Sequence, residues 1–461
     1  VGAAAVQSSV FYNYGSIDMV DGAANDALTI IGDFADDAML VINPTDTLGD
    51  FDDDGEVNVD VDGATLSSDR LFIEGNVWAG TSNTVNVNLL SLPSAADILA
   101  GETIDVISVS GTSNASNFVL GSVNTTDTAL FTTDYSLVYG GGDYALGFEA
   151  TGLSAAGVLL TSVAPAVQNL WYGSLGTMYQ RQGAERWFSP DGAETDGSAA
   201  VWGRYYANDG AMAPDVKRDN FGGGGSQNYD FSSNGIELGV GYSFNQSWTI
   251  GVLAGTMEGD YKPEAGGKTD LDGNTLGAYV TYVHGNGFYA DLSYRSFDFD
   301  GDVYNGSEVL EVSGDADGYS LEMGYGFKTE SKLEIEPQLQ YSSVSVSMDD
   351  VGYGSGDFEL TDGDSSQFRL GVALRKSYQH DSGLWTPYGS LSYVNVSSAS
   401  NSYAIGGALE GGVDTSGGSA LLELGTDARY NAWVFNAGIS MQDGGAYDFV
   451  FGGQLNVRYA W

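Results

Sequence analysis

FGGQLNVRYAW, residues 451–461, alternates apolar and polar side chains up to an aromatic residue at its end. Successive side chains of an extended strand point to opposite faces, so this segment would have one apolar and one polar face. A single strand of this kind is also typical of a soluble sheet that is buried on one side. The apolar face would carry Phe451, Gly453, Leu455, Val457, Tyr459 and Trp461, and the polar face Gly452, Gln454, Asn456, Arg458 and Ala460.

The same alternation recurs from about residue 190 onward. NGIELGVGYSF (234–244) and SSQFRLGVALRKSY (365–378) show it most clearly. The segments are roughly ten to fourteen residues long, which is the length that a tilted membrane strand needs. We predict twelve strands, near 198–207, 231–244, 247–257, 273–285, 287–299, 317–328, 332–346, 365–377, 384–396, 417–430, 431–442 and 449–461.

The connections between these segments differ in length. Some are tight, as at Asn245-Gln246 and Tyr430-Asn431, whereas the acidic stretches 300–318 and 349–366 are predicted to be long loops. Short turns at one end and long loops at the other are typical of a membrane β-barrel.

Charged residues within the segments share the face opposite to the Leu, Val and Tyr series. An Arg or Lys on a lipid face would cost about 2 to 4 kcal/mol at the membrane midplane, which would explain the segregation if lipid lies outside. A soluble barrel or sandwich would place the charges outside instead, but the many glycines on the polar face favour a wet lumen over a packed core. The predicted lumen-facing residues are Arg204, Glu237, Arg295, Glu322, Glu334, Arg369, Arg375, Arg429 and Arg458.

Composition agrees with a β protein and excludes several classes. The chain has 66 glycines, 8 prolines and 28 tyrosines, which disfavours helices and favours strands. A formal charge of -46 excludes binding to nucleic acid, which needs clustered Lys and Arg. Without a run of 18 apolar residues a transmembrane helix is excluded, so a β-barrel is the remaining way to span a membrane.

One segment before the first predicted barrel strand has helical periodicity. SVAPAVQNLWYGSLGTMYQRQGAERW (162–187) repeats apolar residues at helical spacing, with arginines toward its end. It could cover a sheet as a surface helix, or lie in a wet lumen with its arginines near wall carboxylates such as Glu237 or Glu334. The residues singled out in it are Leu170, Trp171, Met178, Arg181 and Arg186.

The first 160 residues contain short strand-like runs separated by Gly, Asn and Asp. Their spacing of roughly ten to fifteen residues suggests the rungs of a parallel β-helix, with a β-sandwich as the alternative. Asp50, Asp52 and Asp54 match the opening of a calcium loop, but its closing acid is replaced by Val61, so calcium is at most a weak candidate and no other cofactor is expected. With no catalytic motif evident, the sequence predicts no enzyme.

The order of these parts resembles the C-terminal part of a bacterial autotransporter, the type V secretion family. SSDRLFIEGNVWAGTSNTVNVN (67–88) resembles the last rungs of a passenger domain, NLWYGSLGTMYQRQG (169–183) a lumen helix, and AAVWGRYYAN (199–208) a first barrel strand. QLNVRYAW (454–461) resembles the terminal signal for barrel assembly, although Asn456 stands where Gly is usual and Trp461 where Phe is commonest.

The resemblance implies an outer-membrane translocator that places its passenger at the cell surface. It implies a passenger end at 1–163, a lumen helix at 164–188 and a barrel at 189–461. Its expected partners are outer-membrane lipid, the outer-membrane barrel assembly machinery and periplasmic chaperones, around a monomeric barrel. Cleavage within the helix, which some relatives perform at an Asn pair, would fall at Asn169. The assembly-signal residues would be Gln454, Asn456, Tyr459 and Trp461.

Two other functions stay open on the sequence alone. One is a porin-like outer-membrane channel with an N-terminal extension, which should conduct steadily because its lumen would be open. The other is a soluble all-β adhesin whose charged face is its exterior, which would purify without detergent.

Overall fold

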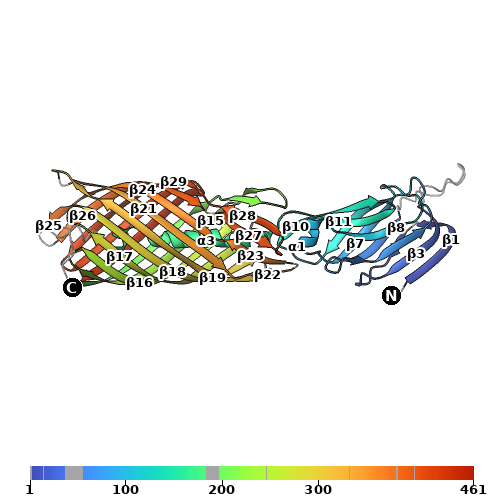
Figure 1. The fold of residues 1–461 in the computed structure, drawn as a ribbon, viewed down its shortest axis with the longest axis horizontal. Coiled ribbons are helices and arrows are strands. Elements are labelled where there is room, and N and C mark those ends of the chain that lie inside the picture. The colour runs from blue at the N-terminus through green and yellow to red at the C-terminus, as the bar shows by residue number, and fades with distance from the viewer. Residues whose placement is uncertain are drawn as a thin grey trace.

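The chain forms an elongated molecule with a closed barrel at one end and a stack of parallel strands at the other (Figure 1). This computed structural model describes residues 3–13, 15–36, 55–182, 197–245, 247–331, 333–354, 356–380, 383–398 and 400–461. Within those ranges, each helix is too short or too polar to cross a bilayer.

Twelve antiparallel strands close into the barrel, which confirms the predicted fold class. The segment quoted first lies in β31, which pairs with β12 on one side and β30 on the other and so joins the two ends of the sheet. The barrel strands are β12 (Ser198–Met212), β15 (Tyr229–Phe244), β16 (Trp248–Pro263), β17 (Lys268–Val283), β18 (Phe288–Asn305), β19 (Glu308–Tyr325), β21 (Leu333–Met348), β24 (Asp364–Lys376), β26 (Gly383–Ser398), β29 (Gly417–Tyr430), β30 (Trp433–Gly444) and β31 (Tyr447–Ala460), with β20 (Phe327–Lys328) and β25 (Tyr378–His380) as short extensions.

The outer wall of the barrel is apolar. Leu238, Leu276 and Leu391 are each more than 60% exposed, at 62%, 66% and 63%. Exposing a continuous apolar belt of this kind to water would be unfavourable, whereas the acyl chains of a bilayer would cover it. The apolar side chains of each strand therefore face lipid, and the alternate side chains face the lumen.

The two ends of the barrel differ. The end with short turns, such as 284–287, is the turn end, and the other is the loop end. The predicted loop at 300–318 is wrong, because β18 and β19 continue to a tight turn at Gly306. Residues of three loop-end connections form a further six-stranded sheet, here called the loop sheet, made of β13 (Asp215–Arg218), β14 (Gly225–Ser226), β22 (Val351–Tyr353), β23 (Gly356–Asp362), β27 (Ser400–Ile405) and β28 (Leu409–Asp414).

The described residues between 3 and 153 form the N-terminal stack. Two parallel sheets run rung by rung, with orders β1-β3-β6-β8 and β2-β4-β7-β9, as the β-helix prediction requires. The antiparallel hairpin of β10 and β11 ends the stack next to the barrel. Its elements are β1 (Ala3–Asn13), β2 (Ser16–Asp18), β3 (Ala27–Asp36), β4 (Glu56–Asp62), β5 (Ser67–Ser68), β6 (Arg70–Glu74), β7 (Asn83–Ser91), α1 (Ala95–Ala100), β8 (Thr103–Val109), β9 (Phe118–Thr125), β10 (Phe131–Gly140) and β11 (Asp143–Leu153).

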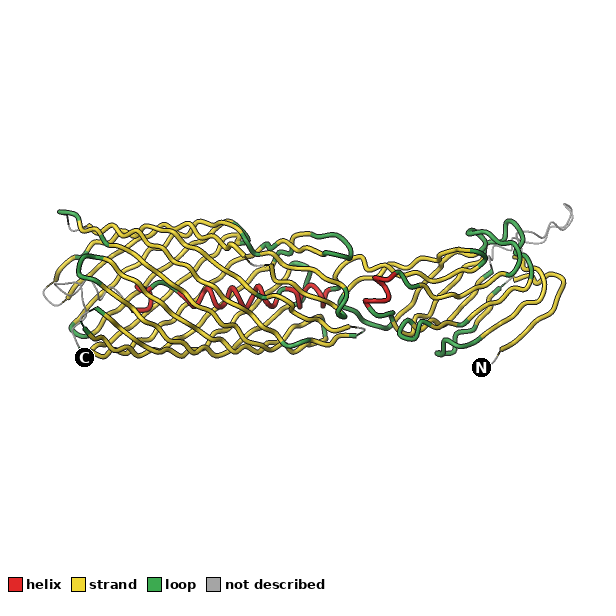
Figure 2. The backbone as a smooth tube through the Cα atoms, in the orientation of Figure 1, coloured by secondary structure: helices red, strands yellow, loops and turns green. Residues whose placement is uncertain are grey.

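Three helices lead from the stack into the barrel (Figure 2). They are α2 (Ala155–Thr161), α3 (Val163–Leu175) and α4 (Met178–Gln182), so helical structure begins earlier than the predicted residue 164. Ser154 caps α2, because its hydroxyl accepts from the Gly157 backbone N–H at 3.2 Å. Gly176 has a φ of 57°, which ends α3.

Candidate functional site in the barrel lumen

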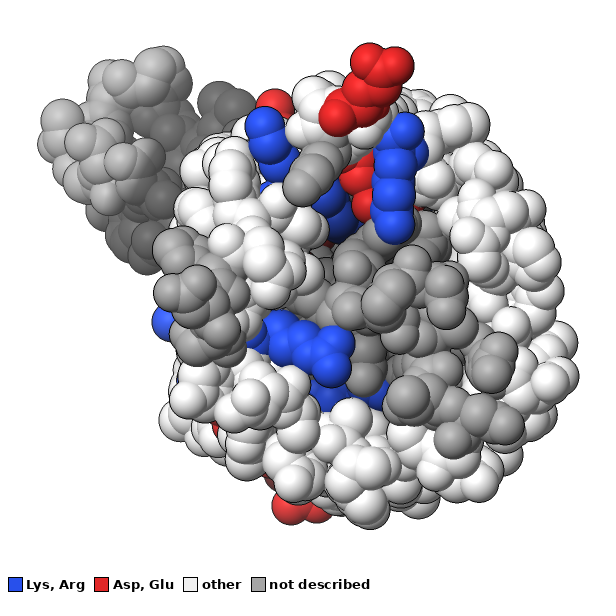
Figure 3. Space-filling view, turned by 90° about the vertical axis from the view of Figure 1, so that its left-hand side faces the viewer, with Lys and Arg blue, Asp and Glu red and all other residues white. Residues whose placement is uncertain are grey.

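The lumen wall carries the charged residues that the sequence places on the polar strand face. Their burial follows from the strand alternation, which directs every second side chain inward. Figure 3, a view onto the turn end, shows Lys and Arg side chains around and within the opening. Arg429 is half-buried, and the buried members of the predicted set are Arg204, Glu237, Arg295, Glu322, Glu334, Arg369, Arg375 and Arg458.

Helix α3 fills the lumen near the loop end. Leu170 and Trp171 are buried, and the Trp171 ring lies against the wall at Gly318, where a Cβ would overlap it. The Tyr261 hydroxyl donates to the Ala166 carbonyl at 2.9 Å. The interpretation as a surface helix is therefore wrong, since wall side chains enclose α3.

Two wall arginines hold the C-terminal end of α3. The Ser174 carbonyl accepts from Arg204 Nη1 and from Arg295 Nη1, each at 2.9 Å. Glu237, which is fully buried, pairs with Arg295 and lies 3.7 Å from Arg204 Nη1. Cationic groups favour the negative end of the helix dipole, so these residues form a charged clamp on α3. We call Ser174, Arg204, Glu237 and Arg295 the helix clamp.

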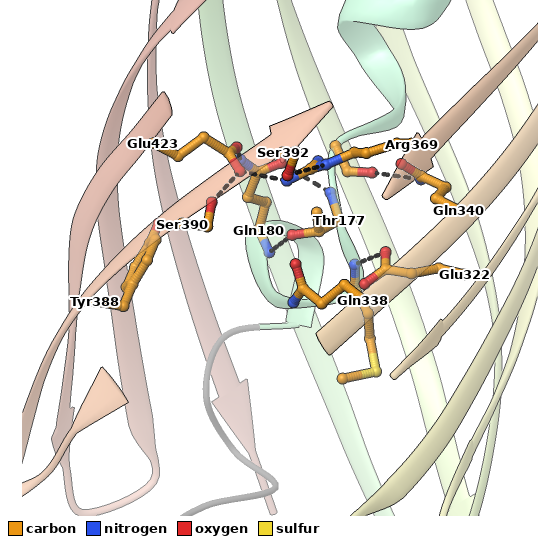
Figure 4. A network of polar contacts seen from close by, with 12 residues as sticks. Thr177, Gln180, Glu322, Gln338, Gln340, Arg369, Tyr388, Ser390, Ser392 and Glu423 are labelled. Carbon is orange, nitrogen blue, oxygen red and sulfur yellow. Dashed lines mark hydrogen bonds and ion pairs between the residues drawn. The ribbon is translucent and has the colours of Figure 1, made fainter. Parts of the chain in front are cut away.

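A second network holds the first residues of α4 (Figure 4). Gln180 donates to Glu423 Oε1 at 2.7 Å, and Glu423 also pairs with Arg369. From another part of the wall, Glu322 Oε2 accepts from the Met178 backbone N–H at 2.9 Å. The two networks fix the chain from several strands at once.

Helix α4 is fixed at the turn end. The sequence predicted wall carboxylates such as Glu237 or Glu334 near the helix arginines. The structure instead pairs Arg181 with Asp291, at 2.5 Å between Arg181 Nη2 and Asp291 Oδ1. Asn456 in the last strand donates to the Arg181 carbonyl at 2.9 Å. Asn456, which stands where Gly is usual, thus contacts the helix. Gln454 in the same strand donates to Asn436 Oδ1 at 3.2 Å.

Some of the predicted residues fall outside the described part of the chain. Other residues of the site were not singled out from the sequence. Arg186, Asp50, Asp52 and Asp54 lie outside the described residues. In the part that the structure describes, there is no group of three His, Asp or Glu side chains that could hold a metal. Asp291, Glu336 and Glu423 were recognisable only as polar-face residues, and nothing in the sequence distinguishes Ser174 or Gln180.

The surroundings of Asn169 contain hydroxyl groups. Its Oδ1 accepts from Tyr261 at 3.2 Å and its Nδ2 lies 3.5 Å from the Tyr447 hydroxyl. A phenol hydroxyl is a weak base at neutral pH, so these partners position the amide and do little to activate it.

A cavity of about 140 Å³ remains beside the helix, lined in part by Asn169, Gln180 and Arg369. Helix α3 packs against β16 and β21, so the free space lies on the side of β24 to β31. The space is polar and large enough for a few water molecules.

At the barrel seam, the aromatic residues of the last strand lie near the turn end. The Tyr459 ring is 4.8 Å from that of Trp433 and 5.9 Å from that of Trp461, which is 65% exposed. Aromatic side chains of this kind collect at a membrane interface. The last strand therefore closes the barrel and presents its aromatic end outward.

These features define a transmembrane β-barrel with a helix held in its lumen. The chain matches the autotransporter β-domain family over residues 201–440, just over half of its length, and it belongs to that family. It is an outer-membrane protein of type V secretion, and the translocator domain of this family is typically non-catalytic.

Autotransporters are among the proteins to which the chain is similar. The pertactin autotransporters of Bordetella parapertussis and Bordetella bronchiseptica are each 28% identical over 218 residues, which is 45% of this chain and 22% of theirs. The chain thus spans about a fifth of the length of these curated relatives. Among solved structures, the transport unit of AIDA-I from Escherichia coli is 13% identical, covering 65% of this chain and 97% of that one at a TM-score of 0.46. The translocator domain of NalP from Neisseria meningitidis is 14% identical, covering 66% and 99% at a TM-score of 0.46.

Proposed function

We propose that the barrel delivers the N-terminal stack to the cell surface and keeps it attached there. The path of the chain through the lumen carries this proposal. Near the loop end, Gln168 donates to the Gly363 carbonyl at 2.8 Å, and near the turn end Gln182 donates to Thr281 at 2.8 Å. The chain thus crosses the barrel between the stack and β12, which places the stack on the side opposite to the turns.

The topology supports the domain limits that we propose. These are a passenger end at 1–163, a segment with the lumen helix at 164–188 and a barrel at 189–461. Of the predicted wall residues, Arg204, Arg295 and Glu322 bind the helical segment rather than a substrate. The assembly machinery recognises β31 by Gln454, Asn456, Tyr459 and Trp461 before the strand closes the barrel, and periplasmic chaperones keep the chain unfolded until then.

Protease treatment of intact cells tests the topology. We expect digestion of the N-terminal stack and one protected fragment that begins between residues 154 and 197 and ends at Trp461, because lipid and the lumen shield the rest. Mass spectrometry of the outer-membrane fraction gives its first residue.

Cells with a permeabilised outer membrane are the control, because protease then also reaches the turn end. A fragment from untreated cells that begins at Leu170 would show cleavage after Asn169. Digestion of the barrel strands in intact cells, or recovery of the whole chain in a detergent-free soluble fraction, would contradict the proposal.

The porin-like alternative is disfavoured by the same geometry. In the described part of the chain, the lumen helix and its partners leave a cavity of about 140 Å³ beside the helix, which has room for a few water molecules and is too small for a wide aqueous path.

A further inference from the structure

The outer wall of the barrel has an apolar groove over strands β15, β16 and β17, which are neighbours in the sheet. At its centre the small side chain of Ala254 lies between Leu238 and Leu276, which face it in register on the two flanking strands. The two leucines are 62% and 66% exposed, so they form the sides of the groove and Ala254 forms its floor. The groove has a volume of about 420 Å³ on the lipid side of the wall, where it can hold an acyl chain.

A group of carboxylates follows the groove toward the loop end on the same strands. Glu258 of β16 lies directly opposite Asp272 of β17, and Asp260 lies opposite Asp270. Like charges that face each other across two strands destabilise a sheet. Lys268 Nζ pairs with Asp260 at 3.2 Å and with Asp270 at 2.6 Å. Among the described residues, no Lys or Arg forms an ion pair with Glu258 or Asp272, so this second pair lacks a cationic partner.

The four carboxylates line a polar pocket of about 300 Å³. Lys268 shows that an ammonium group fits between two of them, since its Nζ contacts both Asp260 and Asp270. Lys262 is a second cation close to Asp260, and the four carboxylates still outnumber the two ammonium groups. The pocket therefore carries an excess of negative charge and favours a cationic group from outside the protein.

The groove and the pocket are spaced like the parts of one lipid. Ala254 and Glu258 are four residues apart, which is about 14 Å along a strand that rises about 3.4 Å per residue. Half of the hydrocarbon core of a bilayer is about 15 Å thick. Trp248 begins β16 at the turn end and is typical of one membrane interface. Counted from there, Ala254 lies in the hydrocarbon layer and Glu258 near the head groups of the opposite leaflet.

We propose that this part of the outer wall binds a lipid whose head group carries a primary amine. One acyl chain lies in the groove at Ala254, and the ammonium group donates hydrogen bonds to Glu258 and Asp272. Charge complementarity selects the amine, because the carboxylates repel an anionic head group and a quaternary ammonium has no N–H to donate. The bound lipid supplies the positive charge that the sheet lacks at this point. The site lies on the outer wall and is independent of the path of the chain through the lumen.

Native mass spectrometry of the full chain in detergent tests this proposal. The probes are phosphatidylethanolamine and phosphatidylcholine with identical acyl chains, because their head groups have the same net charge and differ in N–H donors. We expect the wild-type chain to bind phosphatidylethanolamine about tenfold more tightly. The double variant Glu258→Gln with Asp272→Asn should bind both lipids equally. Equal binding by the wild-type chain would overturn the proposal. A preference for phosphatidylglycerol that requires Mg²⁺ would also overturn it, because a metal ion would then occupy the pocket.

A matched control removes two facing charges elsewhere on the outer wall. Asp298 and Asp315 also lie opposite each other, on β18 and β19. The wall nearby carries the facing residues Tyr294 and Tyr319, which are 51% and 45% exposed, where the proposed site has Ala254. Asp298→Asn with Asp315→Asn should therefore keep the wild-type preference. Loss of the preference in this control would mean that overall charge, and not the pocket, selects the lipid.

A further variant tests the groove separately from the pocket. Ala254→Phe fills the space between Leu238 and Leu276 and should weaken the binding of both lipids several-fold. Ala437→Phe is its control, because Ala437 lies on the outer face of β30, between the exposed Phe435 and Ile439. Heat-modifiable migration on gels shows whether the barrel of each variant is folded. Equal lipid binding by the two folded Phe variants would contradict a role of the groove.

Discussion

Glu237→Ala is expected to release the lumen helix and open the barrel to ions. Glu237 is fully buried between Arg204 and Arg295, so its loss leaves two buried guanidinium groups without their shared counter-charge. Removing one partner of a buried ion pair typically costs about 3 to 5 kcal/mol. The barrel strands should persist, because their backbone pairing does not involve this carboxylate. Conductance of the purified full chain in planar bilayers should rise several-fold, since water and ions would enter the loosened lumen.

Glu258→Ala is the control for this experiment. Glu258 lies on the neighbouring strand β16, but its side chain is exposed and bonded to Asn234 at 2.7 Å. An exposed contact of this kind contributes little to stability. Equal conductance in the two variants would show that the helix clamp does not hold α3.

Phe118→Ala is expected to unfold much of the N-terminal stack while the barrel stays intact. Phe118 is 1% exposed, and its ring lies 4.9 Å from that of Tyr144 and 5.7 Å from that of Phe34. A buried Phe→Ala change costs about 3 to 5 kcal/mol, and each rung depends on its neighbours. Urea unfolding followed by limited proteolysis should show a lower midpoint for the stack, and heat-modifiability should be unchanged.

Val119→Ala provides a matched comparison in the same strand. Val119 is 42% exposed and points away from the core, so its truncation should alter the midpoint little. A Phe118→Ala stack as resistant as that of Val119→Ala would mean that the aromatic contacts across the rungs do not stabilise it.

The outline of the barrel could be predicted because its signal is local. Successive side chains of each strand face lipid and lumen in turn, so every segment has a period of two. This period can be recognised in a single strand such as β31, even when its neighbouring strands are not known. The strand pattern is weaker where the barrel strands extend past the apolar outer wall. Residues 300–318 carry Asp on the outward face, which resembles a loop in composition although β18 and β19 continue through them.

The sequence by itself determined the class of protein, the number of barrel strands and the face on which each charged side chain lies. Only the tertiary structure decided which charges meet: Arg181 binds Asp291, and Arg204 and Arg295 share Glu237 and the Ser174 carbonyl. The physical reason is that strand periodicity is a property of neighbouring residues, whereas these contacts depend on the register and closure of distant strands around one helix.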